Sequence, residues 1–363
     1  MRVACGAGCL DGLANALARA GVGRPLICCG PTLARDPGGL ARLLGFLDGV
    51  VCTVFDGVTP HSTIPSVTRA VGLAREAGVD GILAFGGGSA VVTARAVAIG
   101  LAEDAPFHAL ATRAEGGRIV SPRLARPKLP VFVVQTTPNT ASVKAGTAVK
   151  DTETGRRLPM FDPKTRTRVL FLDPVFLNAT PQEVIRLAAL QTLSQTVEGL
   201  AAETPDPFAV AALRHAMDLL SEALPHSDSP DRAMILSQAA VLTGEATDHT
   251  GGGAIAAALS HTIASVLDLP TGAVAAPILP HTIRFNAAAG GRTLQRAFGG
   301  EPSAACRDLI AAAGGPLRLR DVGVPQDSLP AIAETAMSDY FLSRNPIPVT
   351  ESDVLLDLLR TSY

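Results

Sequence analysis

Aromatic residues are scarce in this chain: among 363 residues there are no tryptophans and two tyrosines, and aromatics make up only 4%. Proteins that recognise bases by stacking need exposed aromatic rings, so this deficit argues against that class. The formal net charge of -2 argues equally against a basic nucleic-acid or membrane-binding surface. The abundant residues are small and apolar, which is typical of closely packed helices and buried parallel strands.

Long apolar runs are also missing, since no segment reaches the roughly 18 uninterrupted residues that a membrane span needs. The N-terminal stretch is interrupted by Asp11 and Arg19 and lacks a signal-peptide core. We therefore expect a soluble, cytoplasmic protein. Six cysteines fit neither a disulfide framework nor a paired metal motif. We interpret most of them as small buried thiols: Cys5, Cys9, Cys28, Cys29, Cys52 and Cys306.

The first half of the chain alternates short β-branched runs with alanine-rich stretches, which predicts βαβ units and a parallel sheet covered by helices. Strands are expected at 25–29, 50–55, 81–85 and 131–135. Helices are expected at 9–20, 36–46, 65–77 and 89–101, and Gly21 and Gly78 stand where helix C-caps belong.

Two segments of this half break the alternation. Residues 105–128 are predicted to be irregular. Residues 145–151 and 167–171 are predicted to form a β-hairpin before Asp173.

After Pro174 the pattern becomes helical. Thr180, Pro181 and Glu183 have the spacing of a capping box, which predicts a helix that ends near Ala202. Further helices are predicted at 207–223, 230–246, 253–266, 273–288, 303–313, 326–340 and 351–361. The predicted fold is an α/β nucleotide-binding domain at 1–174 with a mostly parallel sheet, followed by an all-helical domain at 175–363.

Two loops follow buried strands and have the composition of ligand-binding turns. Gly86, Gly87, Gly88 and Ser89 open a helix, whose N-terminal amides attract a pyrophosphate. The alternative is a plain strand-to-helix turn, because the spacing is not that of the dinucleotide fingerprint. The loop 135–142 carries four hydroxyls, which either bind phosphate or ribose or satisfy their own turn. Parallel strands would place both loops at one edge of the sheet.

Several segments together resemble the iron-containing alcohol dehydrogenase superfamily, and in particular its maleylacetate reductase branch. The segments are GGGSAVVTARAVA, QTTPNTAS, FLDPVFLNATPQEV, LSHTIASVLDLPTGAVAAPILPHTIRFN and FDGVTPHSTIPSV. They cover nearly the whole chain in the family's order. The resemblance implies a dehydroquinate synthase-like architecture, an active-site cleft between the two domains, a bound NADP or NAD, and a homodimer.

The resemblance also locates a departure from the family, which holds a divalent metal with one aspartate and three histidines. The four matching positions here are Gln191, Gln195, Ala257 and Thr271. Amide, methyl and hydroxyl groups are poor ligands for iron or zinc, so we expect no catalytic metal at this site. His249, His261 and His281 could rebuild a site only if they converged, and the last two are too far apart to share a helical turn.

His261 matches a second histidine of the family, which lies near the nicotinamide and does not bind the metal. An imidazole there can exchange a proton with the substrate oxygen near neutral pH. The alternative is a helix histidine that bonds a neighbouring carbonyl. Gln191 and Gln195 either hydrogen-bond a substrate carbonyl or form a satisfied polar pair, and Glu198 is expected to be structural.

Eight residues are predicted to bind the cofactor: Gly30, Gly86, Gly87, Gly88, Ser89, Thr136, Thr137 and Thr140. Gly30 stands where the family often carries an acidic residue that grips the adenosine ribose, so NADPH should be tolerated at least as well as NADH. Val92 and Arg95 stand where members often carry an aspartate and a lysine.

These residues leave three hypotheses open. The leading one is a metal-independent NAD(P)H-dependent reductase that acts on a carbonyl or conjugated C=C of a small organic molecule. The second is a non-redox cyclase, dehydratase or isomerase that uses His261 as general acid and base. The third is a catalytically inactive binding protein on the same scaffold.

Overall fold

The computed structural model describes residues 1–115, 118–202, 206–250 and 253–363. The chain forms two compact units. The first contains Met1–Thr137 and Ala141–Thr180, and the second contains Pro138–Thr140 and Pro181–Tyr363. No helix within the described ranges is long and apolar enough to cross a membrane.

A six-stranded parallel sheet forms the centre of the first unit, in the order β1-β10-β7-β4-β2-β3. Its strands are β1 (Arg2–Cys5), β2 (Pro25–Cys28), β3 (Thr53–Phe55), β4 (Gly81–Gly86), β7 (Val131–Gln135) and β10 (Thr167–Leu172). Strands β2, β4 and β7 are buried along their whole length, as continuous apolar runs in a parallel sheet require. The predicted α/β class is confirmed. The edge strand β1 was not predicted, because it is short and largely exposed.

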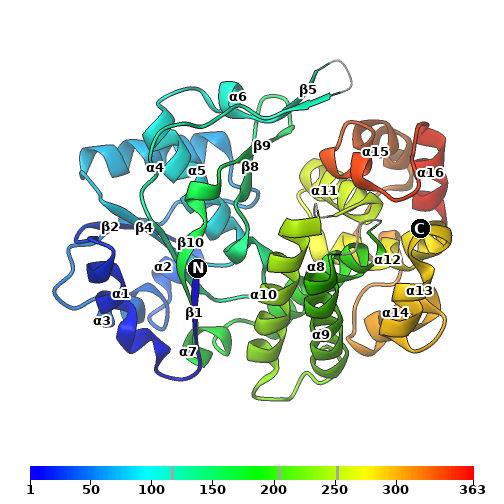
Figure 1. The fold of residues 1–363 in the computed structure, drawn as a ribbon, viewed down its shortest axis with the longest axis horizontal. Coiled ribbons are helices and arrows are strands. Elements are labelled where there is room, and N and C mark those ends of the chain that lie inside the picture. The colour runs from blue at the N-terminus through cyan, green and yellow to red at the C-terminus, as the bar shows by residue number, and fades with distance from the viewer. Residues whose placement is uncertain (116–117, 203–205, 251–252) are drawn as a thin grey trace. The chain divides into compact units, whose positions relative to one another are not determined.

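Helices cover both faces of this sheet (Figure 1). They are η1 (Cys9–Gly12), α1 (Leu13–Arg19), α2 (Pro31–Arg35), α3 (Leu40–Gly45), α4 (Ile64–Glu76), α5 (Gly88–Glu103) and α7 (Pro174–Leu177), whereas α6 (Phe107–Leu110) lies beside β9. Leucines of α1 and α3 pack with Phe85, Phe132 and Phe171 in one apolar core, while α4 and α5 lie on the other face. Gly21 and Gly78 end α1 and α4 with φ values of 75° and 58°, as predicted.

The predicted hairpin is wrong in its second strand. Strand β8 (Gly146–Lys150) pairs antiparallel with β9 (Arg157–Phe161), whereas residues 167–172 form β10 between β1 and β7 of the parallel sheet. The burial patterns explain the difference. Strand β8 alternates buried and half-buried positions, as a hairpin with one covered face does, but β10 ends in three consecutive buried residues.

The segment 105–128 contains more structure than predicted. It includes α6 and the strands β5 (Arg113–Glu115) and β6 (Arg118–Val120), which pair antiparallel. Residues 116–117 lie outside the described part of the chain.

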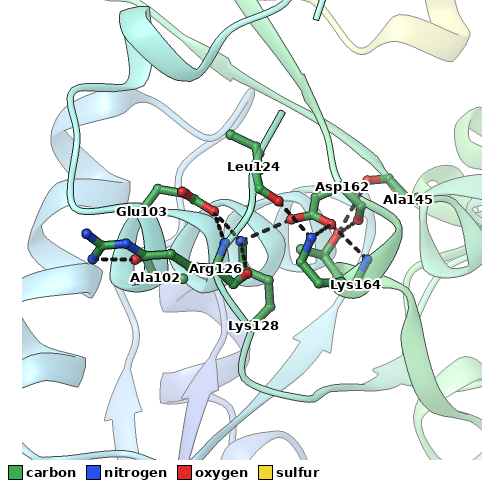
Figure 2. Close-up of polar contacts among 9 residues, drawn as sticks. Ala102, Glu103, Leu124, Arg126, Lys128, Ala145, Asp162 and Lys164 are labelled. Carbon is green, nitrogen blue, oxygen red and sulfur yellow. Dashed lines mark hydrogen bonds and ion pairs between the residues drawn. The ribbon is translucent and has the colours of Figure 1, made fainter. Parts of the chain in front are cut away.

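A buried lysine holds the end of this segment in place (Figure 2). The Lys128 ammonium lies 2.6 Å from Glu103 Oε1 and 3.0 Å from Asp162 Oδ2, and its side chain is fully buried. It also donates a hydrogen bond to the Arg126 carbonyl at 2.7 Å. One cation therefore joins α5, the segment before β7 and the turn after β9.

The two carboxyl groups respond to this arrangement. The hydrogen bond from Lys128 lowers the pKa of Glu103. Burial opposes ionisation of Asp162, but hydrogen bonds from Lys164 and Lys128 outweigh it and lower the pKa of that carboxyl. Lys164 also donates to the Leu124 carbonyl at 2.7 Å.

The second unit contains helices and no strand in its described residues. They are α8 (Gln182–Ala201), α9 (Pro207–Ala223), α10 (Arg232–Thr250), α11 (Ile255–Leu267), α12 (Thr271–Phe285), α13 (Ala287–Phe298), α14 (Pro302–Ala312), η4 (Leu319–Val322), η5 (Gln326–Ser328), α15 (Leu329–Ala336), η6 (Tyr340–Arg344) and α16 (Ser352–Thr361). Helix α8 packs against α9, α10 and α12, and α12 packs against α11 and α14. These contacts place α8 and α12 at the centre of the unit.

Several predicted helix boundaries are wrong. The helix predicted at 36–46 begins only at Leu40, the one at 273–288 is divided between α12 and α13, and the one at 326–340 is divided between η5, α15 and η6. Thr180 does not cap α8, whose N-cap is Pro181. The Thr180 hydroxyl instead donates to the Thr136 carbonyl at 2.8 Å, which removes it from the helix end.

Replacing the buried lysine should destabilise the protein. Lys128→Met is expected to lower the free energy of unfolding by about 3–5 kcal/mol, because it leaves two carboxylates without their buried cation. Lys164→Met removes a half-exposed partner of the same Asp162 and should cost about 1 kcal/mol or less. Chemical denaturation followed by circular dichroism measures both. Equal losses would contradict a special role for the buried ammonium.

The same cluster predicts a pH dependence. A carboxyl group with a lowered pKa stabilises the folded chain above its unfolded-state pKa, and this contribution is lost as the pH falls through the folded-state pKa. The free energy of unfolding should therefore decrease below about pH 4. The decrease should be smaller in Lys128→Met, where Glu103 and Asp162 lose the cation that lowers their pKa values. Identical pH profiles would show that other groups dominate.

Candidate active site

The glycine turn lies at the end of β4. Gly86 has a φ of 145°, a conformation that favours glycine, and Gly87 is the N-cap of α5. The amides of Ala90 and Val91 bond the Gly87 carbonyl, at 3.1 and 3.4 Å. The amides of Gly88 and Ser89 precede Ala90, the first amide that donates to the Gly87 carbonyl, so they present donors and a partial positive charge at the helix end. This cradle fits an anionic group such as a pyrophosphate.

The threonine turn leaves the neighbouring strand at the same edge. Gln135, the last residue of β7, is in register with Gly86, and the Thr136 amide bonds the Gly86 carbonyl at 3.1 Å. A Cβ on Gly87 would lie 2.8 Å from Thr137 Oγ1, so only glycine allows the two turns to approach this closely. The β4–β7 pairing therefore brings the predicted turns together.

Gly30 follows the next strand of the same sheet. It is the N-cap of the short helix α2, directly after β2, which pairs with β4. The predicted cofactor residues on these three strands thus share the carboxyl edge of the sheet, where open α/β sheets bind their ligands.

The glycine turn is bonded to a second segment, 61–62, whose sequence contributes to the family resemblance but did not indicate this contact. His61 and Ser62 both have positive φ values, 59° and 52°, which are uncommon outside glycine. The buried Ser62 hydroxyl donates to the Ser89 carbonyl at 3.1 Å and accepts from Thr93 Oγ1 at 3.0 Å. A backbone of this kind costs about 1–3 kcal/mol per residue and persists where surrounding contacts require it. No local sequence signal marks it.

The threonine turn is held by side chains as well. Arg95, which is fully buried in α5, donates to the carbonyls of Ala141 and Gly146. The Ser142 hydroxyl donates to Gln135 Oε1 at 2.6 Å, and Gln135 Nε2 is buried without a hydrogen-bond partner among the described residues. The turn is therefore fixed before any ligand binds.

In the second unit, Gln191 and Gln195 lie one turn apart on α8. Thr140, which the contacts assign to this unit together with Pro138 and Asn139, donates its hydroxyl to Gln195 Oε1 at 2.7 Å. This bond holds the Gln195 side chain through its oxygen. Gln191 Oε1 is buried and accepts no hydrogen bond within the described chain.

Glu198, one further turn along α8, contacts the start of α11. Its Oε1 accepts from the Ala256 amide at 2.7 Å, and its Oε2 accepts from the Ala257 amide at 3.2 Å. Burial raises the pKa of Glu198 to about 7, while these amide hydrogen bonds act in the opposite direction. The contacts give Glu198 a structural role as a cap of α11.

His261 lies on α11, one turn beyond Ala257, and is half-buried. Its ring centroid is 5.3 Å from that of Phe341 in η6, with an interplanar angle of 57°. His281 lies on α12, where burial and the neighbouring Arg284 and Arg307 lower its pKa. The side chain of His249 lies outside the described residues.

The start of α12 approaches α8 so closely that only glycine fits. A Cβ on Gly272 would overlap the Leu187 carbonyl oxygen and would lie 3.1 Å from the backbone nitrogen of Gln191. Thr271, the first residue of α12, is held against α8 by this contact. The segment of α8 that carries both glutamines is thus bordered by the beginnings of α11 and α12.

Comparison with known sequences identifies this architecture. The pattern of iron-containing alcohol dehydrogenases matches residues 1–174, and that of the C-terminal domain of Fe-containing alcohol dehydrogenases matches residues 189–363. The chain belongs to the iron-containing alcohol dehydrogenase family.

Relatives within the family match almost end to end. Lactaldehyde reductase of Escherichia coli K12 is 28% identical over 382 residues, which cover 99% of this chain and 97% of that protein. Maleylacetate reductase 1 of Cupriavidus pinatubonensis is 28% identical over 374 residues, which cover 100% of this chain and 95% of that protein. The crystal structure of a 1,3-propanediol oxidoreductase shares the fold, with a TM-score of 0.91 and a sequence identity of 21%. The match covers 100% of this chain and 98% of that chain. The predicted family, its maleylacetate reductase-like branch and the oxidoreductase class are confirmed.

The family's metal does not fit the side chains at the four positions where the resemblance places its ligands. Gln191 and Gln195 offer neutral amides, Ala257 offers a methyl group, and Thr271 offers a hydroxyl. Iron and zinc sites in proteins use imidazole, thiolate and carboxylate ligands. In the described part of the chain, no three His, Cys, Asp or Glu side chains are grouped to hold a metal ion.

The close approach of α12 to α8 can be tested by mutation. Gly272→Ala should lower the free energy of unfolding by about 3 kcal/mol, because the added methyl group forces the two helix backbones apart. Gly291→Ala is a matched control in α13, where a Cβ meets nothing within 4 Å, and should stabilise by up to about 1 kcal/mol. Chemical denaturation measures both. A neutral Gly272→Ala would show that α12 tolerates displacement.

Proposed function

We propose that this protein is a metal-independent NAD(P)H-dependent reductase that acts on a carbonyl or conjugated C=C of a small organic substrate. One observation carries the proposal: an intact anion cradle at Gly86–Ser89 is combined with a helical site whose metal-ligand positions hold amide, methyl and hydroxyl side chains. The named activities of the lactaldehyde and maleylacetate reductases support the reaction class.

The first unit would bind the cofactor. The amides of Gly88 and Ser89 would hold the pyrophosphate, and the threonine turn would lie beside it at the same edge of the sheet. Gly30 contributes no carboxylate to repel a 2′-phosphate, which favours NADPH at least as much as NADH. A bound nicotinamide supplies the hydride.

The second unit would bind and polarise the substrate. The amide groups of Gln191 and Gln195 would hydrogen-bond and polarise the substrate oxygen. Neutral amides stabilise a developing alkoxide less than a Lewis acid does. Conjugated or acidic substrates need less of this stabilisation, since they delocalise the charge. His261 would then deliver the proton to the substrate.

A non-redox reaction with His261 as general acid and base is the second candidate, and the replacement of all four ligand positions motivates it equally. NADPH fluorescence separates the two candidates. Binding followed by oxidation of NADPH with a panel of small carbonyl and enoate substrates supports the reductase. Absence of any nucleotide binding would refute it, whereas binding without turnover would weaken the reductase and leave the non-redox enzyme and the catalytically inactive binding protein.

The histidine assignment predicts a specific kinetic effect. His261→Asn should lower kcat by about 10² or more, because it removes the proton donor, and should leave the Kd for NADPH unchanged. His281→Asn is the control and should retain the wild-type kcat. Stopped-flow oxidation of NADPH gives the rate, and fluorescence titration gives the Kd. Full activity in His261→Asn would exclude this role.

Metal independence can be tested directly. Dialysis against a strong chelator should leave kcat unchanged, and elemental analysis of the active protein should find iron and zinc far below one equivalent per chain. Loss of activity that is restored by added Fe²⁺ or Zn²⁺ would contradict the proposal.

A further inference from the structure

Three buried polar side chains surround the first turn of α11. Glu198, Asn286 and Asn345 are all more than nine-tenths buried, and they come from α8, the α12–α13 junction and the residue after η6. Burying such groups is costly unless their hydrogen bonds are made, so their contacts define what they do.

The contacts converge on the backbone of α11. Asn345 Oδ1 accepts from the Ile255 amide at 3.3 Å, and Glu198 accepts from the amides of Ala256 and Ala257. Three successive amides at the helix start are therefore bonded to side chains, where a helix normally leaves its donors without intrahelical partners.

Asn345 is itself held on its other side. Its Nδ2 donates to Asn286 Oδ1 at 2.9 Å and to the Ile347 carbonyl at 2.7 Å, while Asn286 Nδ2 donates to Asn345 Oδ1 at 2.8 Å. This reciprocal amide pair orients Asn345 toward α11. It also connects the C-terminal end of η6 to the first turn of α11. Helix η6 contains Phe341, and α11 contains His261.

The first turn of α11 is buried and, apart from Ile255, is made of alanines. It reads Ala254, Ile255, Ala256, Ala257 and Ala258, and a Cβ on Gly253 would overlap the Ala257 methyl group. Alanines provide few contacts that could fix the rotation of the helix about its axis. The hydrogen bonds from Ile255, Ala256 and Ala257 to Asn345 and Glu198 add a directional constraint to the burial of this turn.

We propose that Glu198 and Asn345 are positioning residues that fix the first turn of α11 and thereby set the orientation of the His261 ring against Phe341. His261 lies one helical turn beyond Ala257, so a rotation or shift of the first turn carries the imidazole with it. The catalytic role of His261 rests on the proposed function. The orientation of its ring by Glu198 and Asn345 does not depend on that function.

The test reads the His261 environment separately from turnover. Long-range ¹H–¹⁵N spectra of the imidazole groups are recorded for the wild type, with the His261 signal assigned from its absence in His261→Asn. Asn345→Ala and Glu198→Gln should both shift this signal. Asn345→Asp keeps the acceptor for the Ile255 amide and should shift it less than Asn345→Ala does. Thr196→Val, a buried isosteric change on α8 that breaks the hydrogen bond to Thr243, is the control and should leave it unchanged.

Kinetics provides the second readout. Asn345→Ala and Glu198→Gln should lower kcat between about ten- and a hundredfold, as a misplaced catalytic group does, with the KM for NADPH unchanged. Chemical denaturation shows whether each variant is folded. If Glu198→Gln does not fold, the two Asn345 variants carry the test.

The two proposals fail in different ways. An unshifted His261 signal in folded Asn345→Ala and Glu198→Gln would overturn the positioning role, whatever the activity. A shifted signal in a protein that never oxidises NADPH would support the positioning role and contradict the proposed reductase.

Discussion

At Gly87, Gly253 and Gly272, the backbone approaches its neighbour more closely than any side chain would permit. The first lies against Thr137, the second against Ala257, and the third against the Leu187 carbonyl oxygen. These three contacts set the spacing of the two turns at the sheet edge and the placement of α11 and α12 beside α8. The abundance of small residues and the scarcity of aromatic residues in the sequence therefore have a direct structural counterpart. Every candidate site residue of the second unit depends on this close packing.

Buried polar side chains add hydrogen bonds that hold the turns and helix ends of the candidate site. Arg95 holds the threonine turn through two backbone carbonyls, Thr140 orients Gln195, and Glu198 caps α11. Each is buried, and each bonds a backbone group or another side chain. A site organised in this way pays little reorganisation energy during a reaction. That property would matter for the proposed reductase, in which neutral side chains stand at the positions where the resemblance places the metal ligands.

The strands and turns of the first unit were predictable because their signals are local. The strands β4 and β7 are apolar runs, and each is followed by residues that break a strand. The misassigned β10 shows the limit of such signals. Its sequence is compatible with a hairpin or a central strand, and only its neighbours β1 and β7 decide between them. The same limit applies to Thr180, whose position suits a helix cap but whose hydroxyl bonds the Thr136 carbonyl.

Some features of the candidate site were also predictable from the sequence, and others depended on tertiary packing. Residue types at known motif positions indicated the family, the glycine turn and the unusual side chains at Gln191, Gln195, Ala257 and Thr271, because these are properties of the chain itself. The bond from Thr140 to Gln195, the capping of α11 by Glu198 and Asn345, and the tilted ring contact of Phe341 with His261 were not predictable. Each joins residues far apart in the sequence, and each depends on which way a side chain points once the helices have packed. Local pattern carries no information about that direction, so only the tertiary structure decides it.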